Sequence, residues 1–337
     1  MDHNGLENLQ GKCCLVTGAN GFVGSHLVDE LLAREAVVRA LVRETSNLRW
    51  LEGKSAELVY GELRDPKSLP PALSGVDCVF HVAGVVRAMG RDAYFRVNSG
   101  GAASLLEACC AAGRPRIVLV SSLAAGGPSG RGPAVSEDDP ARPVSFYGES
   151  KLDAERVAAE YSDRLPIAIV RPPVIYGPRD TDVFQLIKAA DRWRIAAVAG
   201  GADMPISVAH VLDVVQSLIL AAQSDASAGQ IFYMAGPKAI TTGELIDAIE
   251  RAVRHRVFRI PVPAPVLRIV GHLAELQSAI TKKPALLNSD KVREMLAGGW
   301  VCNIEKARRL LGFEPKIDIV EGMKSTVEWC RENAWLV

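Results

Sequence analysis

Apolar residues in the first half of the chain gather in short runs that are rich in β-branched side chains. These runs are apolar throughout instead of alternating with polar residues, which is typical of strands buried on both faces of a sheet. Six such runs lie at 12–17, 37–42, 57–60, 77–82, 116–121 and 166–171.

Stretches of helical length separate these runs. Strands that alternate with helices form βαβ units, whose strands are parallel because each helix carries the chain back to the same end of the sheet. The pattern predicts a doubly wound α/β fold, with helices at 22–34, around 47–52, 66–73, 93–112 and 145–162.

The pattern of predicted elements changes in the second half of the chain. We predict two helices around a Gly-rich stretch, then a strand, a helix with a capping box, a proline-rich extended connector and a final helix. These elements fall at 183–223, 230–234, 241–253, 256–268 and 318–333.

Apolar residues recur at helical spacing within 261–281. We predict that this stripe packs onto the smaller lobe, and the alternative hypothesis is weak contact with a membrane surface. The stripe comprises Val266, Leu267, Ile269, Val270, Leu273, Leu276 and Ile280.

Composition narrows the class of protein. Lys plus Arg and Asp plus Glu both number 39, so the basic surplus of nucleic-acid-binding proteins is absent. No apolar run approaches the roughly 18 residues of a membrane-spanning helix, and the polar N-terminus shows no secretory signal. The cysteines are odd in number without a CxxC pair, and the histidines lack metal spacing. We expect a cytoplasmic protein without a catalytic metal.

A glycine-rich turn joins the first predicted strand to the first helix. Gly18, Gly21 and Gly24 are spaced three apart. Glycine lets the backbone turn sharply and approach a pyrophosphate, and the following helix N-terminus offers free N–H groups. The turn indicates a Rossmann-type dinucleotide site, and the alternative is an ordinary glycine turn.

The end of the second strand bears on which dinucleotide is bound. NAD-selective sites place an acid here to bind the ribose 2′-OH, whereas this sequence has Arg43, with Ser46 and Arg49 close behind. A guanidinium can hold a 2′-phosphate through charge-assisted hydrogen bonds. We favour NADP(H) over NAD(H), and the alternative is that Arg43 is a solvated surface charge.

Tyr147 and Lys151 stand four residues apart on a predicted helix and so share a face. A lysine ammonium in this place favours the phenolate and lowers the pKa of the tyrosine. Tyr147 could then exchange a proton with a substrate oxygen while hydride moves to or from a nicotinamide. Ser122, at the end of the preceding strand, could hydrogen-bond the same oxygen. The alternative is an exposed helix pair without chemistry.

Together these residues resemble the extended short-chain dehydrogenase/reductase family, also called the NAD(P)-dependent epimerase/dehydratase family. TGANGFVG matches its glycine motif, and Ser122, Tyr147 and Lys151 match its catalytic Ser/Thr, Tyr and Lys. The similarity extends in order to LGFEPKIDIVEGMKSTVEW near the end of the chain. The resemblance therefore implies a catalytic role for these three residues.

The resemblance also implies a set of cofactor contacts and a homodimer paired through the helices at 93–112 and 145–162. The contacts come from the glycine turn, an adenine-edge motif with Glu in place of the usual Asp, and segments after the second, fourth and sixth strands. The implied residues are Gly18, Asn20, Gly21, Phe22, Val23, Gly24, Arg43, Ser46, Glu62, Leu63, Val82, Ala83, Gly84, Asn98, Tyr147, Lys151, Pro172 and Val174.

The domain division follows from these motifs. Residues 10–180 are predicted to form the Rossmann-type nucleotide-binding domain, to which 205–235 returns. Residues 181–204 and 236–337 are predicted to form a smaller α/β substrate-binding lobe.

Departures from the family's sugar-nucleotide members indicate an apolar substrate. Val174 and Ile206 replace the Asn and Arg that grip a diphosphate, and Leu123 and Ala124 replace the Asp-Glu pair of dehydratases. ALVRETSNLR, FHVAGVV and PALLNSDKVREML fit the branch that contains dihydroflavonol reductases and 3β-hydroxysteroid dehydrogenases.

The predicted function is an NADP(H)-dependent oxidoreductase with Tyr147 as general acid/base. It would interconvert a secondary alcohol and a ketone on a bulky, mostly apolar molecule that is steroid-, sterol-, polyketide- or β-ketoacyl-like. The alternatives are a nucleotide-sugar 4-epimerase with tightly bound NAD and a non-catalytic NADP-binding regulator.

Overall fold

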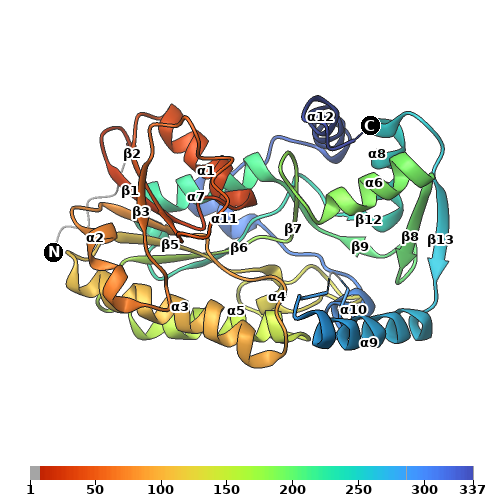
Figure 1. The fold of residues 1–337 in the computed structure, drawn as a ribbon, viewed down its shortest axis with the longest axis horizontal. Helices are drawn as coiled ribbons and strands as arrows, with labels where there is room; N and C mark the ends of the chain where they lie inside the picture. The colour runs from red at the N-terminus through yellow and green to blue at the C-terminus, as the bar shows by residue number, and fades with distance from the viewer. Residues whose placement is uncertain (1–7, 286, 337) are drawn as a thin grey trace.

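A seven-stranded parallel sheet forms the centre of one half of the molecule (Figure 1). The computed structural model describes residues 8–285 and 287–336. The strand order is β3-β2-β1-β4-β5-β6-β11, so the chain starts in the middle, builds one edge and crosses back to build the other. The strands are β1 (Cys13–Thr17), β2 (Val37–Val42), β3 (Glu57–Tyr60), β4 (Cys78–His81), β5 (Arg116–Val120), β6 (Ile167–Arg171) and β11 (Ile231–Tyr233).

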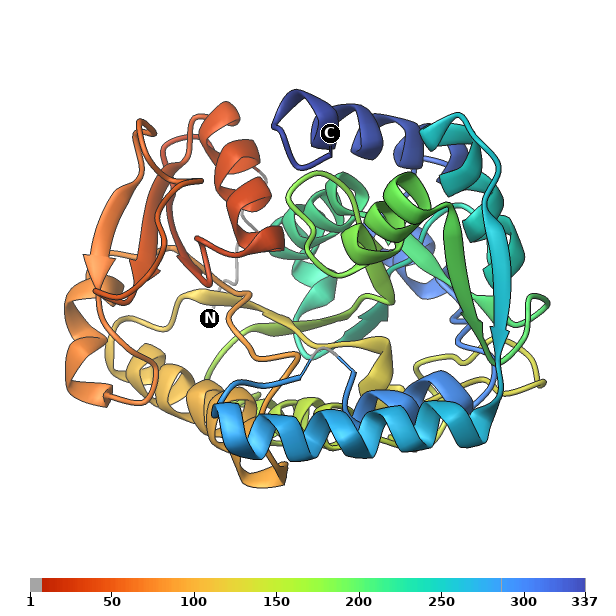
Figure 2. The ribbon, with the colours of Figure 1, turned by 45° about the vertical axis from the view of Figure 1, so that its right-hand side comes forward.

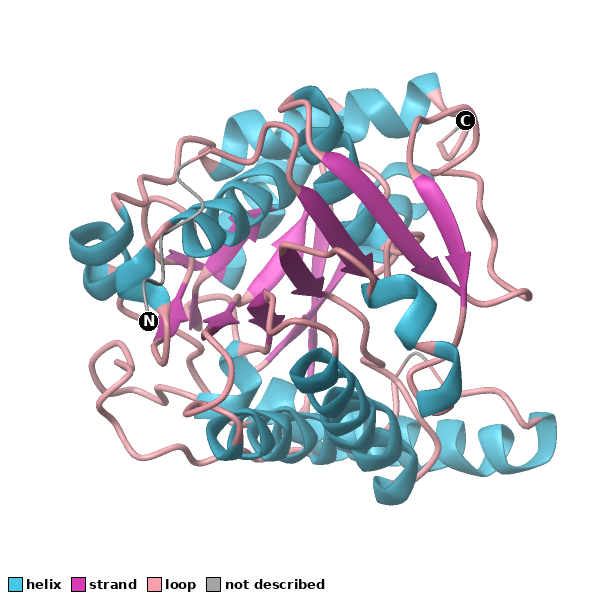
Figure 3. Ribbon diagram, turned by 90° about the vertical axis from the view of Figure 1, so that its left-hand side faces the viewer, coloured by secondary structure: helices cyan, strands magenta, loops and turns pink. Residues whose placement is uncertain are grey.

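Two layers of helices cover the sheet because successive side chains of a strand point to opposite faces. In β1, Cys14 and Val16 pack in one apolar core and Leu15 packs in another. Figure 3 shows the strands between these layers. One layer holds α1 (Phe22–Ala33), α7 (Val211–Gln223) and α11 (Glu305–Leu311), and the other holds α2 (Pro70–Leu73), α3 (Arg91–Ala111) and α5 (Phe146–Glu160).

The predicted parallel sheet is confirmed, and the run at 230–234 adds its seventh strand, β11. The helix predicted around 47–52 is wrong, because this segment is a turn whose Trp50 packs against aromatic rings near the C-terminus. The helix predicted at 66–73 is split into the 3₁₀ turn η1 (Pro66–Ser68) and α2. Prolines open both pieces, since a proline suits the first turn of a helix and not its interior.

A second group of elements forms a smaller lobe with its own apolar core. Pairs of short strands cross-link it: β10 with β7, β12 with β9, and β13 with β8. The lobe contains β7 (Val174–Tyr176), α6 (Val183–Trp193), β8 (Ile195–Ala199), β9 (Pro205–Ile206), β10 (Val208–His210), β12 (Ile240–Thr241), α8 (Thr242–Val253), β13 (Phe258–Val262), α9 (Ala264–Thr281), α10 (Ser289–Leu296) and α12 (Ile319–Glu332).

Several predictions for this half hold and others fail. The capping box at Thr241 and Glu244 is present at the start of α8, and the final helix is α12. The proline-rich segment 256–268 is extended only as far as β13, because Pro265 lies in the first turn of α9. The prediction did not include α10 and α11.

The apolar stripe of α9 does not pack as predicted. On this helix only Leu267, Gly271 and Ser278 are buried. Leu276 and Ile280 are 65% and 83% exposed. Figure 2 shows α9 running along the outer edge of the molecule. No helix within the described ranges is both long and apolar enough to cross a membrane.

The packing departs from the predicted domain division at two places. The strands β7, β9 and β10 contribute to the core of the lobe, whereas the division placed them in the nucleotide-binding domain. The second place is near residue 300. Cys302, Ile304 and Phe313 belong to the apolar core beneath the large sheet, whereas the division placed them in the lobe. The reason is that the chain returns from α10 to the sheet, where α11 packs beside β11.

A buried ion pair fastens α5 to the sheet. The Arg171 guanidinium donates from Nε and Nη2 to the Glu155 carboxylate, at 2.9 and 2.6 Å. The two side chains are only 3% and 4% exposed. Tyr233 and Ser121 complete the network through their hydroxyls. A pair with this geometry is costly to break, because either partner alone would leave an uncompensated buried charge.

Glu155→Gln should therefore destabilise the fold by about 3–5 kcal/mol. Urea unfolding followed by circular dichroism measures this free energy. Glu160→Gln, an exposed position on the same helix, is the matched control and should change it by less than about 0.5 kcal/mol. Equal stability of the two variants would contradict this account of α5.

Candidate active site

The glycine turn after β1 is shaped by close backbone approach. A side chain at Gly24 would place its Cβ 2.1 Å from the Gly18 carbonyl oxygen. Gly18 has a φ of +70°, and a Cβ there would lie 2.8 Å from the Ala83 amide nitrogen. The turn thus lies against the segment after β4, at the point where the strand order reverses. Open α/β sheets bind their ligands at this point.

The start of α1 fits a dinucleotide phosphate. Its N-cap is Gly21, and no side chain caps the helix. The first N–H groups of the helix therefore have no side-chain partner of their own, and the positive end of the helix dipole stands beside the glycine turn. These residues would hold the pyrophosphate of NAD(P).

The segment after β4 meets α3 and α5 at the same edge of the sheet. A Cβ on Gly84 would lie 3.0 Å from Lys151 Nζ and 3.1 Å from Asn98 Oδ1. The Asn98 amide bonds both backbone groups of Val85 and the Ser150 hydroxyl. Asn98 therefore joins this segment to α5, and its hydrogen-bonding groups are already in use.

Ser122, Tyr147 and Lys151 come together at the carboxyl edge of β5. Ser122 caps the short helix α4 (Leu123–Gly126) and hydrogen-bonds the Tyr147 side chain. The Lys151 ammonium is buried and donates to the Val120 carbonyl at 2.9 Å. A phenol, a hydroxyl and an ammonium gathered in this way can move a proton to or from a substrate oxygen.

The structure reverses the predicted effect on the phenol. Burial raises the pKa of Tyr147, the Ser122 hydrogen bond opposes this, and nearby Glu294, Tyr94 and Asp182 add to it. Burial also lowers the pKa of Lys151 to about 8. The lowering expected from helical spacing alone is therefore wrong for this structure, because desolvation disfavours the charged form of each group.

Arg43 follows β2 directly and is exposed. Its backbone N–H donates to the Ser46 hydroxyl at 3.1 Å, so the two predicted residues share one turn. Arg49, predicted to assist them, instead lies over the rings of Trp50 and Trp335. The Glu62 carboxylate pairs with Arg64.

The other predicted contacts are distributed around the same edge of the sheet. Asn20 donates to the Asn47 carbonyl, and Phe22 packs edge-on against His26. Val23 and Val82 pack against the core beneath the sheet, and Leu63 packs against the opposite core. Pro172 accepts from the Leu123 amide, while Val174 is half exposed on β7.

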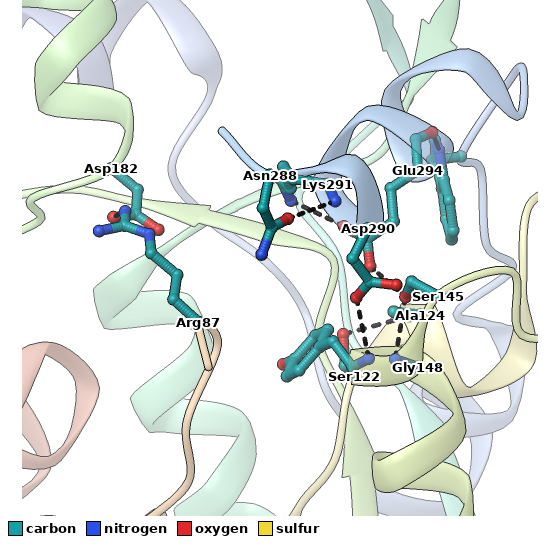
Figure 4. Close-up of polar contacts among 12 residues, drawn as sticks. Arg87, Ser122, Ala124, Ser145, Gly148, Asp182, Asn288, Asp290, Lys291 and Glu294 are labelled. Atoms are coloured by element: carbon teal, nitrogen blue, oxygen red, sulfur yellow. Dashed lines mark hydrogen bonds and ion pairs between the residues drawn. The ribbon is translucent and has the colours of Figure 1, made fainter. Parts of the chain in front are cut away.

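The structure adds residues that the sequence reasoning missed. Asp290, on α10, accepts from the backbone N–H groups of Phe146 and Tyr147. Arg87, after β4, forms an ion pair with Asp182 before α6 (Figure 4). No local pattern marks these residues as site residues, because each partner is distant in the chain.

The family model for the NAD dependent epimerase/dehydratase family matches residues 14–235. The chain belongs to this family. This protein is an NAD(P)-dependent enzyme. The match spans the glycine turn, α5 and all seven strands of the sheet except the first residue of β1.

Two curated relatives of this family member align over most of both chains. Ceramide reductase of Caulobacter vibrioides is 30% identical over 321 residues, with 95% of each chain covered. The decarboxylating sterol-4-alpha-carboxylate 3-dehydrogenase of Mus musculus is 26% identical and covers 95% of this chain and 91% of its own.

A solved structure of MoeE5 in complex with UDP-glucuronic acid and NAD is also similar. It has a TM-score of 0.76 and 27% identity, and it covers 95% of this chain and 99% of its own. The relatives of this epimerase/dehydratase family member thus include proteins named for lipid-like molecules and a protein bound to a nucleotide sugar.

Proposed function

We propose that this enzyme reduces a ketone to a secondary alcohol on a bulky, mostly apolar molecule, using NADP(H). The observation that carries the proposal is the meeting of Ser122, Tyr147 and Lys151 beside the glycine turn and the segment after β4. When bound, the nicotinamide cofactor supplies or accepts hydride.

Tyr147 acts as the general acid. A phenol keeps its proton at neutral pH, and the burial that raises the pKa of Tyr147 does not change this. Tyr147 can therefore donate its proton to the oxygen of a ketone as that oxygen gains charge. Ser122 hydrogen-bonds the phenol and orients it. Lys151, whose pKa burial lowers to about 8, still carries its proton at neutral pH one helical turn from Tyr147.

Apolar side chains at two positions support the substrate class. Val174 is exposed on β7 and Ile206 is buried in β9. Neither can donate a hydrogen bond to a diphosphate, which needs cationic or amide donors when it is partly desolvated. The names of ceramide reductase and of the sterol dehydrogenase support a substrate of lipid-like chemistry.

Tyr147→Phe should lower turnover by about 10²–10⁴-fold, because the variant has no proton to donate. NADPH oxidation with a ketosteroid and with a long-chain β-keto ester measures turnover. Cofactor binding, followed by quenching of tryptophan fluorescence, should remain within about twofold because the phenol is not needed to hold the dinucleotide.

Tyr161→Phe, at the other end of α5, is the matched control and should retain full turnover. Unchanged turnover in Tyr147→Phe would contradict the proposed role of Tyr147 as general acid. Stoichiometric NAD in the purified protein, together with interconversion of UDP-sugars without added cofactor, would establish the epimerase alternative. NADPH binding without turnover of any ketone or sugar would favour a regulator.

The preference for NADP(H) is proposed from the turn after β2. Arg43 is exposed there, Ser46 lies beside it, and no acid immediately follows the strand. A guanidinium in this place can make charge-assisted hydrogen bonds to a 2′-phosphate.

Arg43→Asp should weaken NADPH binding by about tenfold or more, since the carboxylate would repel the 2′-phosphate, while NADH binding holds or improves. Fluorescence titration with both cofactors checks this. Arg131→Asp, at another exposed arginine, controls for the change in net charge. An unaltered ratio of NADPH to NADH affinity would remove Arg43 from the cofactor site.

The outer face of α9 is proposed to touch an anionic membrane surface. Its exposed stripe recurs at helical spacing, with Val266, Ile269, Val270 and Leu273 continuing to the exposed end of the helix. Residues 254–283 contain six Lys or Arg and one acid, although the whole chain is balanced. An apolar stripe flanked by cations is typical of helices that lie in the headgroup region of a bilayer.

Leu273→Glu/Leu276→Glu should lower binding to vesicles containing phosphatidylserine by about tenfold or more, since two charges would enter the apolar boundary. Co-sedimentation measures binding, and added salt should weaken it for the parent protein. Val320→Glu, at an exposed apolar site on α12, is the control.

Absence of vesicle binding by the parent protein would contradict the proposal. If the α9 variants instead convert a dimer to a monomer in analytical ultracentrifugation, the stripe is an interface with a second copy. The homodimer that the family resemblance implies would use α3 and α5, and the same measurement tests it.

A further inference from the structure

The first turn of the catalytic helix is held from a distant part of the chain. Four N–H groups at the start of an α-helix lack partners within the helix. In α5 the Gly148 N–H bonds the Ser145 hydroxyl, and the Phe146 and Tyr147 N–H groups bond the Asp290 carboxylate at 2.7 and 3.2 Å. Ser145 in turn donates to Glu294 at 2.6 Å.

These carboxylates are buried where a charge is costly. Asp290 and Glu294 are 6% and 8% exposed and lie one turn apart on α10. Lys291 pairs with Glu294 at 2.8 Å. Figure 4 shows the Asp290 carboxylate directed at the start of α5, with Ser145 and Gly148 beside it. Two neighbouring carboxylates can stay buried only where hydrogen bonds and cations offset the free energy of removing their charges from water.

A second contact of α10 is with Tyr94, whose ring lies beside that of Tyr147. Asn288 caps α10, and its side chain hydrogen-bonds the phenol of Tyr94 on α3. The ring of Tyr94 lies 6.3 Å from the ring of Tyr147, centroid to centroid. α10 thus contacts both the backbone of Tyr147 and the aromatic ring that packs against its side chain.

We propose that α10 is a positioning element for catalysis, in which Asp290 and Glu294 hold the first turn of α5 and thereby fix where the Tyr147 phenol stands. This inference rests on the proposed role of Tyr147 and extends it to the substrate lobe. α9 packs against α10, so α10 connects α9 to Tyr147.

The charged and titratable groups around Tyr147 come from several elements. Lys151 faces the site from α5, Tyr94 from α3, Asp182 from the segment before α6, and Asp290 and Glu294 from α10. Arg293 lies over the ring of Phe146, and Lys291 neutralises part of Glu294. Because a nearby negative charge disfavours the phenolate, removal of the Glu294 charge should lower the pKa of Tyr147.

Hydrogen exchange of the backbone amides tests the hold on α5 without any substrate. In Asp290→Asn, the amides of 146 and 147 should exchange about tenfold faster or more, because charge-assisted hydrogen bonds to them are lost. Asp163→Asn, an exposed aspartate beyond the other end of α5, should leave these amides unchanged. Unchanged exchange in Asp290→Asn would overturn the proposal.

Steady-state kinetics test the effect on Tyr147. In Glu294→Gln kcat should fall about tenfold while the affinity for NADPH stays within about twofold, because the phenol loses its position and the dinucleotide site does not change.

Unchanged kcat in Glu294→Gln would reduce α10 to an ordinary helix cap and overturn the proposal. Asp290→Glu, which keeps the charge, should recover part of the kcat lost in Asp290→Asn, and failure of this recovery would also count against it. The exchange measurement stays informative if Tyr147→Phe proves fully active, so failure of the proposed function is distinguishable from failure of the positioning role.

Discussion

The position of α5 is the constraint on which the candidate site depends. Its buried face is tied to the sheet by the Glu155–Arg171 pair, and its first turn is tied to α10 by Asp290. Tyr147 lies at the second of these ties, and Lys151 lies between them. A helix that is held at two places by directional bonds keeps the Tyr147 phenol in one position beside the carboxyl edge of the sheet.

The carboxyl edge of the sheet has a different constraint, the close approach of backbone segments. Gly18, Gly24 and Gly84 have no space for a side chain, since a Cβ would meet a carbonyl oxygen, an amide nitrogen or the Lys151 ammonium. These contacts draw β1, β4 and α5 to one place. The uncapped start of α1 then stands where a dinucleotide phosphate can be bound by backbone N–H groups.

The lobe carries the positions on which the proposed substrate class rests. The family includes relatives named for ceramide and sterol chemistry and a structure bound to a nucleotide sugar. Val174 and Ile206 stand on β7 and β9 of this lobe, and the apolar stripe of α9 is exposed on its outer side.

The sequence by itself determined the parallel sheet, the glycine turn and the placing of Tyr147 and Lys151 on one helix, because unbroken apolar runs and short spacings are local signals. Only the tertiary structure decided what lies around them. Asp290 reaches Tyr147 across 143 residues, the Trp50 turn is set by rings near the C-terminus, and the α9 stripe, periodic like any core helix, lies on the surface. Burial decided the ionisation of Tyr147 against the expectation from spacing. Periodicity shows which residues share a face but not what that face meets, and desolvation depends on everything packed around a group.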